Sequence, residues 1–122
     1  MRLVRWPTLV SDYKSLYFKR LIDDGDGRFI LKTDTKDIYE VLLDGYCGPY
    51  LISDEGFLTK YWAIKPNDVG WTFIVDSSDF TCLFPEIVGT GNYKHYVVST
   101  MDTCLSVLSE REPRIREVKR SE

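Results

Sequence analysis

Short apolar segments separated by compact turns are the feature that most limits how this chain can fold. Residues 50–53 (YLIS) and 57–64 (FLTKYWAI) flank the turn sequence DEG, and residues 71–75 (WTFIV) follow the turn Pro66-Asn67-Asp68. Apolar runs of this length, bounded by turn residues, are typical of strands joined by hairpins. The pattern predicts three consecutive antiparallel strands in the middle of the chain.

The flanking segments predict further strands and short helices. Residues 28–33 (RFILKT) and 94–99 (KHYVVS) are rich in β-branched and aromatic residues, so we expect strands there. Residues 34–45 and 99–109 place apolar side chains at helical spacing, which predicts two amphipathic helices. Asp34 or Thr35 can cap the first helix, and Ser99 or Thr100 the second. Residues 13–22 fit either a helix capped by Ser11 or the first arm of a hairpin, and we favour the helix.

These segments together predict an α+β fold, with an antiparallel sheet of about five strands and two or three short helices. At 122 residues the chain is long enough to close one core, so residues 1–122 are expected to form a single domain. Residues 110–122 are highly charged and fit a C-terminal edge strand or a solvated tail. The aromatic share of 14% favours a sheet-rich fold and leaves room for a binding face.

Charge and cysteine content limit the classes of partner and the compartment. The net charge of −3 disfavours nucleic acid, which requires a concentrated positive field, and fits a neutral or basic protein partner better. No run reaches the roughly 18 apolar residues of a membrane span, so no membrane association is expected. Three cysteines without a CxxC pair predict a reducing, cytoplasmic location.

No convincing catalytic, metal or cofactor motif is present. The segment DDGDGR (residues 23–28) puts Ile22 and Thr33 where a calcium loop needs carboxylates, so it predicts a tight turn. The sequence GTG (residues 89–91) fits a hairpin loop better than a phosphate cradle. A cysteine nucleophile would have to pair with His95, the only histidine; Cys47 is the candidate for an exposed thiol, whereas Cys82 and Cys104 are expected in the core. We therefore predict no catalytic residue, no cofactor and no metal.

A partial family pattern spans residues 50–84. It consists of Ile52-Ser53, the strand KYWAIKP (residues 60–66), the segment NDVGWTF (residues 67–73) and an acidic turn with Asp76 and Asp79. It resembles small bacterial domains of the immunity-protein type, in which P-x-x-D-S-G-W-x-F lies between a hydrophobic strand and an acidic turn. The sequence departs from that pattern at Val69, where the family usually has Ser, and in the turn, which lacks the expected glycine and paired glutamates.

The resemblance implies a cytoplasmic, non-catalytic inhibitor that neutralises a bacterial toxin, with a basic toxin domain as its partner. Acidic side chains steer a basic partner and aromatic side chains anchor it. The residues that would form such a binding face are Trp62, Asp68, Trp71, Asp76 and Asp79. Three alternatives stay open, namely a small cysteine/histidine enzyme, a phage or plasmid accessory or regulatory protein, and a homodimer built on the aromatic residues.

Overall fold

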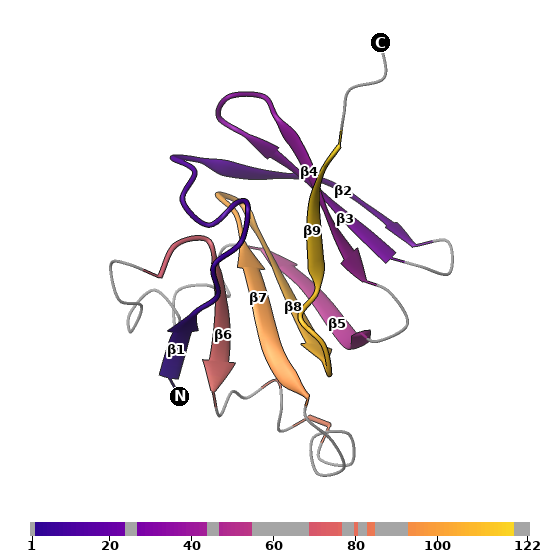
Figure 1. Ribbon diagram of the computed structural model, residues 1–122. Helices are drawn as coiled ribbons and strands as arrows, with labels where there is room; N and C mark the ends of the chain where they lie inside the picture. The colour runs from indigo at the N-terminus through magenta and orange to yellow at the C-terminus, as the bar shows by residue number, and fades with distance from the viewer. Residues whose placement is uncertain are drawn as a thin grey trace.

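In a computed structural model of the protein, the described residues form nine strands in two antiparallel sheets (Figure 1). The structure describes residues 2–23, 27–43, 47–54, 69–76, 80, 83–84 and 93–118. The strands are β1 (Arg2–Arg5), β2 (Leu16–Asp23), β3 (Gly27–Thr33), β4 (Ile38–Leu43), β5 (Cys47–Asp54), β6 (Thr72–Asp76), β7 (Lys94–Ser99), β8 (Thr103–Ser109) and β9 (Arg114–Val118). The five-stranded sheet has the order β1-β6-β7-β8-β5, and the four-stranded sheet has the order β2-β3-β4-β9.

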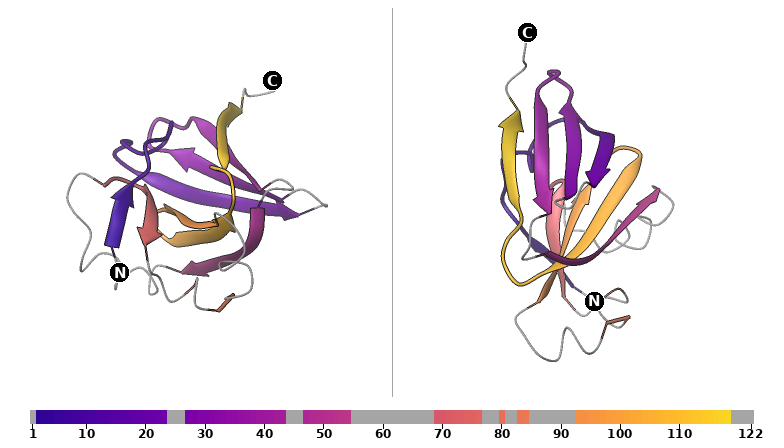
Figure 2. Two further views of the ribbon diagram at one scale, coloured as in Figure 1. Left: turned by 60° about the horizontal axis from the view of Figure 1, so that its bottom comes forward. Right: turned by 90° about the vertical axis from the view of Figure 1, so that its right-hand side faces the viewer.

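The main hydrophobic core lies between the two sheets. Its buried members from the four-stranded sheet are Leu16, Phe29, Leu31, Tyr39, Val41 and Leu43, and those from the five-stranded sheet are Tyr96, Val98, Leu105 and Val107. Alternate residues of each strand therefore point inward, as the two-residue period of a strand requires. The right-hand view of Figure 2 shows the four-stranded sheet as one layer with β9 at its edge.

A second, smaller core covers the other face of the five-stranded sheet. It contains Leu3, Val69, Phe73, Val75, Val97 and Cys104. Strand β8 is consequently buried on both faces, with Cys104 on one side and Leu105 on the other. Central strands buried on both faces have continuous apolar runs instead of an alternating pattern.

The prediction of an α+β fold is wrong, because the structure is nearly all β and its described residues contain no helix. Each segment predicted to be helical contains a strand: β2 replaces the helix expected over residues 13–22, β4 that over residues 34–45, and β8 that over residues 99–109. The sheet of about five strands is likewise replaced by two sheets with nine strands between them.

The strand predictions fared better than the helix predictions. Residues 28–33 and 94–99 are strands, as expected, and β5 and β6 cover residues 50–53 and most of 71–75. In the structure, β5 pairs with β8, and β6 pairs with β1 and β7. The described strands therefore do not show the expected pairing of consecutive strands in the middle of the chain. Residues 57–64 lie outside the described residues.

The two sheets are joined at one edge and separated at the other. Where the edge strands β2 and β5 meet, the Tyr50 hydroxyl donates a hydrogen bond to Asp23 at 2.6 Å. At the opposite edge, the segment after β1 and the strand β9 form the two sides of a groove. The part of the chain that the structure describes contains no helix long and apolar enough to cross a membrane.

Candidate functional site

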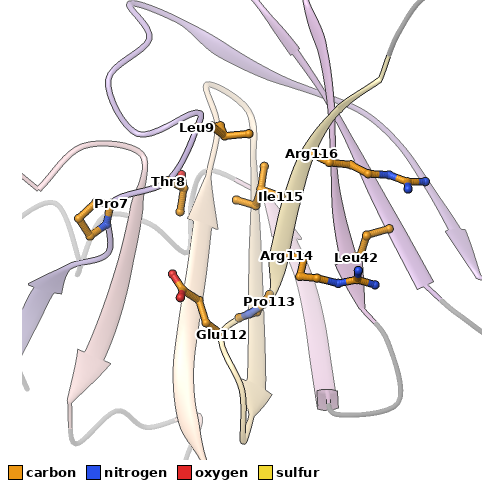
Figure 3. A pocket seen from close by; sticks show the side chains of 9 residues that line it. All are labelled: Pro7, Thr8, Leu9, Leu42, Glu112, Pro113, Arg114, Ile115 and Arg116. Atoms are coloured by element: carbon orange, nitrogen blue, oxygen red, sulfur yellow. The ribbon is translucent and has the colours of Figure 1, made fainter.

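A groove of about 640 Å³ lies beside the edge strand β9 (Figure 3). One wall comes from the segment between β1 and β2, and the other from β9 and the residues before it. The lining residues are Pro7, Thr8, Leu9, Leu42, Glu112, Pro113, Arg114, Ile115 and Arg116. The volume falls within the roughly 300–1,000 Å³ of sites that bind ligands or partner side chains.

The wall formed by Pro7, Thr8 and Leu9 is held by a cluster of buried hydroxyl groups. The Thr8 amide donates to the Ser11 hydroxyl at 2.7 Å, and that hydroxyl lies 2.7 Å from the Thr72 hydroxyl. The Thr72 hydroxyl in turn donates to the Trp6 carbonyl at 2.6 Å. Because the backbone of this wall is tied to β6, Leu9 is presented on a fixed segment with 59% of its surface exposed.

The opposite wall is tied to the first through Trp6. The Trp6 indole N–H donates to the Glu112 carboxylate, although the two residues are 106 positions apart. The Trp6 ring also packs edge-on against Tyr96, with 4.9 Å between ring centroids. These contacts fix the distance between the two walls, so the groove is preformed.

Strand β9 is an edge strand of the four-stranded sheet. It pairs with β4, and no described strand pairs with its other edge. Ile115 packs toward the main core, whereas Arg114 and Arg116 point to the outer face of the sheet. Arg116 forms an ion pair with Glu40, whose side chain is only 4% exposed. This buried carboxylate anchors β9 to β4, because removing its partner would leave a desolvated charge.

Two of the residues predicted for an acidic, aromatic face fall within the described residues, and the structure does not bring them together. Trp71 is half-buried against the main core, and its indole N–H donates to the Tyr13 carbonyl at 2.7 Å. Asp76 is exposed at the far end of β6, about 16 Å along the strand, and lies 3.6 Å from Arg2. Trp62, Asp68 and Asp79 lie outside the described residues.

The groove residues were missed because they come from opposite ends of the chain. The segments RWPTLV (residues 5–10) and EPRIREV (residues 112–118) contain no motif, and each has a proline beside apolar residues. The sequence did indicate an edge strand or tail after residue 110. Nothing in the sequence showed that Pro7–Leu9 would lie against it.

Cys104 and His95 do not form a cysteine/histidine pair. Cys104 pairs with Ser99, which lies four residues along β7 from His95, so about 13 Å separates the two positions. His95 is buried on the second core's side and its ring contacts Phe80, with 5.0 Å between centroids. Burial raises the pKa of the Cys104 thiol to about 11, which keeps it protonated and unreactive at neutral pH.

The buried thiol makes stability depend on pH in the alkaline range. Because the folded state raises the pKa of Cys104 from 9.0 to about 11, the folded protein holds this proton more tightly than the unfolded chain. The resulting stabilisation is complete below pH 9.0 and is lost as the pH rises through about 11. We expect the urea midpoint to fall across this interval, and to fall less steeply in Cys104→Ala.

The urea midpoint of Cys104→Ala should still fall somewhat with rising pH, because hydrogen bonding to Asp23 also raises the pKa of Tyr50. Tyr50→Phe serves as the matched control, and combining it with Cys104→Ala should flatten the profile further. Identical midpoint profiles for the wild type and Cys104→Ala would contradict the role of the thiol.

No group of three or more His, Cys, Asp or Glu side chains that could hold a metal ion occurs among the residues placed by the structure. Comparison of the chain with protein-family models, with curated proteins and with solved structures found no match. The groove must therefore be interpreted from its own chemistry.

Proposed function

We propose that the chain is a non-catalytic protein-binding module that holds an extended segment of a partner protein in the groove beside β9. The observation that carries this proposal is the position of the groove along a strand whose outer edge no described strand pairs with. An extended peptide can add to such an edge, with main-chain hydrogen bonds supplying affinity and side-chain pockets supplying specificity.

The side chains of the groove suit this mode of binding. Pro7, Leu9, Pro113 and Ile115 provide apolar contact area, while Arg114 carries a charge at the rim. An anchor residue of the partner can be desolvated between Leu9 and Ile115, and polar groups remain at the edges. Apolar centres with polar rims are the usual anatomy of specific protein interfaces.

The contacts that fix the two walls also favour a binding site over a groove that is only a by-product of packing. The hydroxyl cluster around Ser11 and the Trp6–Glu112 hydrogen bond hold both walls before any partner arrives. A preformed site loses less conformational entropy on association than one that must be ordered.

Leu9→Ser tests the proposal. We expect partner affinity to fall about tenfold or more, because burying a leucine side chain contributes roughly 1.5–3 kcal/mol. The partner is captured from a lysate of the host with the tagged protein, and the purified pair is then titrated by calorimetry. Leu51→Ser is the matched control, since Leu51 is also an exposed leucine, at 47%, on the edge strand β5. Equal affinities for both variants would refute the groove as the binding site.

The same titration tests the more specific function that the sequence resemblance implies, inhibition of a basic bacterial toxin. Of the acidic residues predicted for the binding face, Asp76 is the one that the structure describes, and its side chain is exposed. A partner that is lost with Asp76→Lys and retained with Leu9→Ser would favour an immunity-type interface over the groove. A partner lost with Leu9→Ser alone would favour the groove.

A further inference from the structure

The outer face of the four-stranded sheet gathers basic side chains from three of its strands, β2, β3 and β9. Strand register places its residues in three rows, since partners across an antiparallel pair share a face. One row holds Arg20, Ile30, Glu40 and Arg116, the second holds Tyr17, Lys32, Ile38 and Val118, and the third holds Ile22, Arg28, Leu42 and Arg114. We call these rows the basic face.

The charges of the basic face are largely of one sign. Arg20, Lys32, Arg114 and Arg116 are exposed, and Arg28 is half-buried. Among the described positions of these rows, Glu40 is the one acidic residue, and it is buried in its ion pair with Arg116. The face is therefore positive although the chain as a whole has a net charge of −3.

The spacing of the cations suits an extended chain of carboxylates. Arg20 lies opposite Ile30, and Lys32 is two residues from Ile30 on the same face of β3. This diagonal position separates the two cations by about 8 Å. Carboxylates along an extended peptide repeat at similar intervals, because alternate side chains point the same way.

From this charge pattern we infer that the basic face docks an acidic, partly apolar polypeptide segment. Carboxylates of the partner pair with Arg20 and Lys32, while its apolar side chains contact the exposed Tyr17 and the half-buried Leu42. The basic face shares Leu42, Arg114 and Arg116 with the lining of the groove. The inference nevertheless does not depend on binding in the groove, because Arg20 and Lys32 lie outside that lining.

The composition of the basic face favours a polypeptide over a nucleic acid. Every row places an apolar residue beside a cation, and a carboxylate lies in the central row at Glu40. A phosphate backbone would gain nothing from the apolar positions, whereas the apolar side chains of a polypeptide can contact them.

Charge reversal on the basic face provides the test. The probe is a fluorescein-labelled peptide in which Glu and Val alternate, and anisotropy measures its affinity for the full-length protein. We expect the double variant Arg20→Glu/Lys32→Glu to weaken binding at least tenfold. Lys14→Glu/Lys94→Glu changes the net charge equally at exposed sites outside the basic face, and we expect its affinity to stay within twofold of the wild type.

The remaining measurements separate this inference from its alternatives. Binding should weaken when salt is raised from about 50 to about 300 mM, since exposed ion pairs are screened, and a peptide with Gln in place of Glu should not bind. Leu9→Ser should leave the affinity unchanged, so a failure of the groove proposal would not be mistaken for a failure here. No peptide binding, equal losses in both double variants, or tighter binding of a DNA oligonucleotide or of phosphatidylserine vesicles would overturn the inference.

Discussion

Phe29→Ala is expected to lower the free energy of unfolding by about 3–5 kcal/mol, the range observed when a buried aromatic side chain is removed from a core. Phe29 is 0% exposed at the centre of β3 and stacks on Phe18, with 4.7 Å between ring centroids. It lies between Leu21 and Val41, its register partners on the neighbouring strands. Truncation therefore leaves a cavity that the paired strands cannot easily close.

Urea unfolding followed by tryptophan fluorescence measures this loss. Domains of this size have total stabilities of about 5–15 kcal/mol, so Phe29→Ala can leave too little folded protein to analyse. Phe29→Leu keeps most of the apolar volume and should cost about 1–1.5 kcal/mol, which provides a graded second measurement. A loss below about 1 kcal/mol for Phe29→Ala would contradict the position of this ring in the core.

The segment over β4 shows why strands were mistaken for helices. Ile38, Val41 and Leu42 lie at helical spacing, but in the structure Val41 faces the core while Ile38 and Leu42 face outward. The outer face is half-covered, so apolar residues occur on both sides of the strand and the two-residue period is obscured. Thr35, considered as a helix cap, instead donates to Asp37 at 2.7 Å in the tight turn between β3 and β4.

The same ambiguity arose at β8. This strand is buried on both faces, and its apolar residues occur as two adjacent pairs, Cys104-Leu105 and Val107-Leu108, which either period can fit. Thr100 closes the β7–β8 hairpin instead of capping a helix, because its hydroxyl accepts a hydrogen bond from the Thr103 amide at 2.9 Å. Serine, threonine and aspartate favour both helix caps and turns, so they cannot distinguish the two.

In β2, a β-bulge explains why the spacing of apolar residues in the sequence resembles that of a helix. The register shifts between Phe18 and Arg20, so Phe18 and Leu21 both face the core although they are three residues apart. Three-residue spacing is what a helix would show. By contrast, β3 and β7 were predicted correctly, because β-branched and aromatic residues dominate them and turn residues bound them.

The candidate site was less predictable than the strands. Trp71 is predicted as a binding residue because of its place in the motif; in the structure it is half-buried, and its backbone amide donates to the Ser11 carbonyl at 3.1 Å. The groove and the basic face both depend on β9 pairing with β4, a long-range contact that no local pattern encodes. Local sequence predicted individual strands, and the sites arose from the way in which those strands pair.

Gly70→Ala is expected to destabilise the protein by about 2–4 kcal/mol, because it combines backbone strain with a steric clash. Gly70 has φ of 78°, and a Cβ atom there would lie 2.5 Å from the Ser11 carbonyl oxygen. That oxygen accepts the hydrogen bond from the Trp71 amide, so the backbone cannot move apart without losing it. Gly27→Ala is the control, since Gly27 lies in the extended strand β3 and a Cβ atom there would lie 3.2 Å from the Leu43 Cβ, a milder overlap than at residue 70. Thermal unfolding should therefore give a markedly lower Tm for Gly70→Ala than for Gly27→Ala, and the reverse order would show that the close approach of residue 70 to Ser11 does not limit stability.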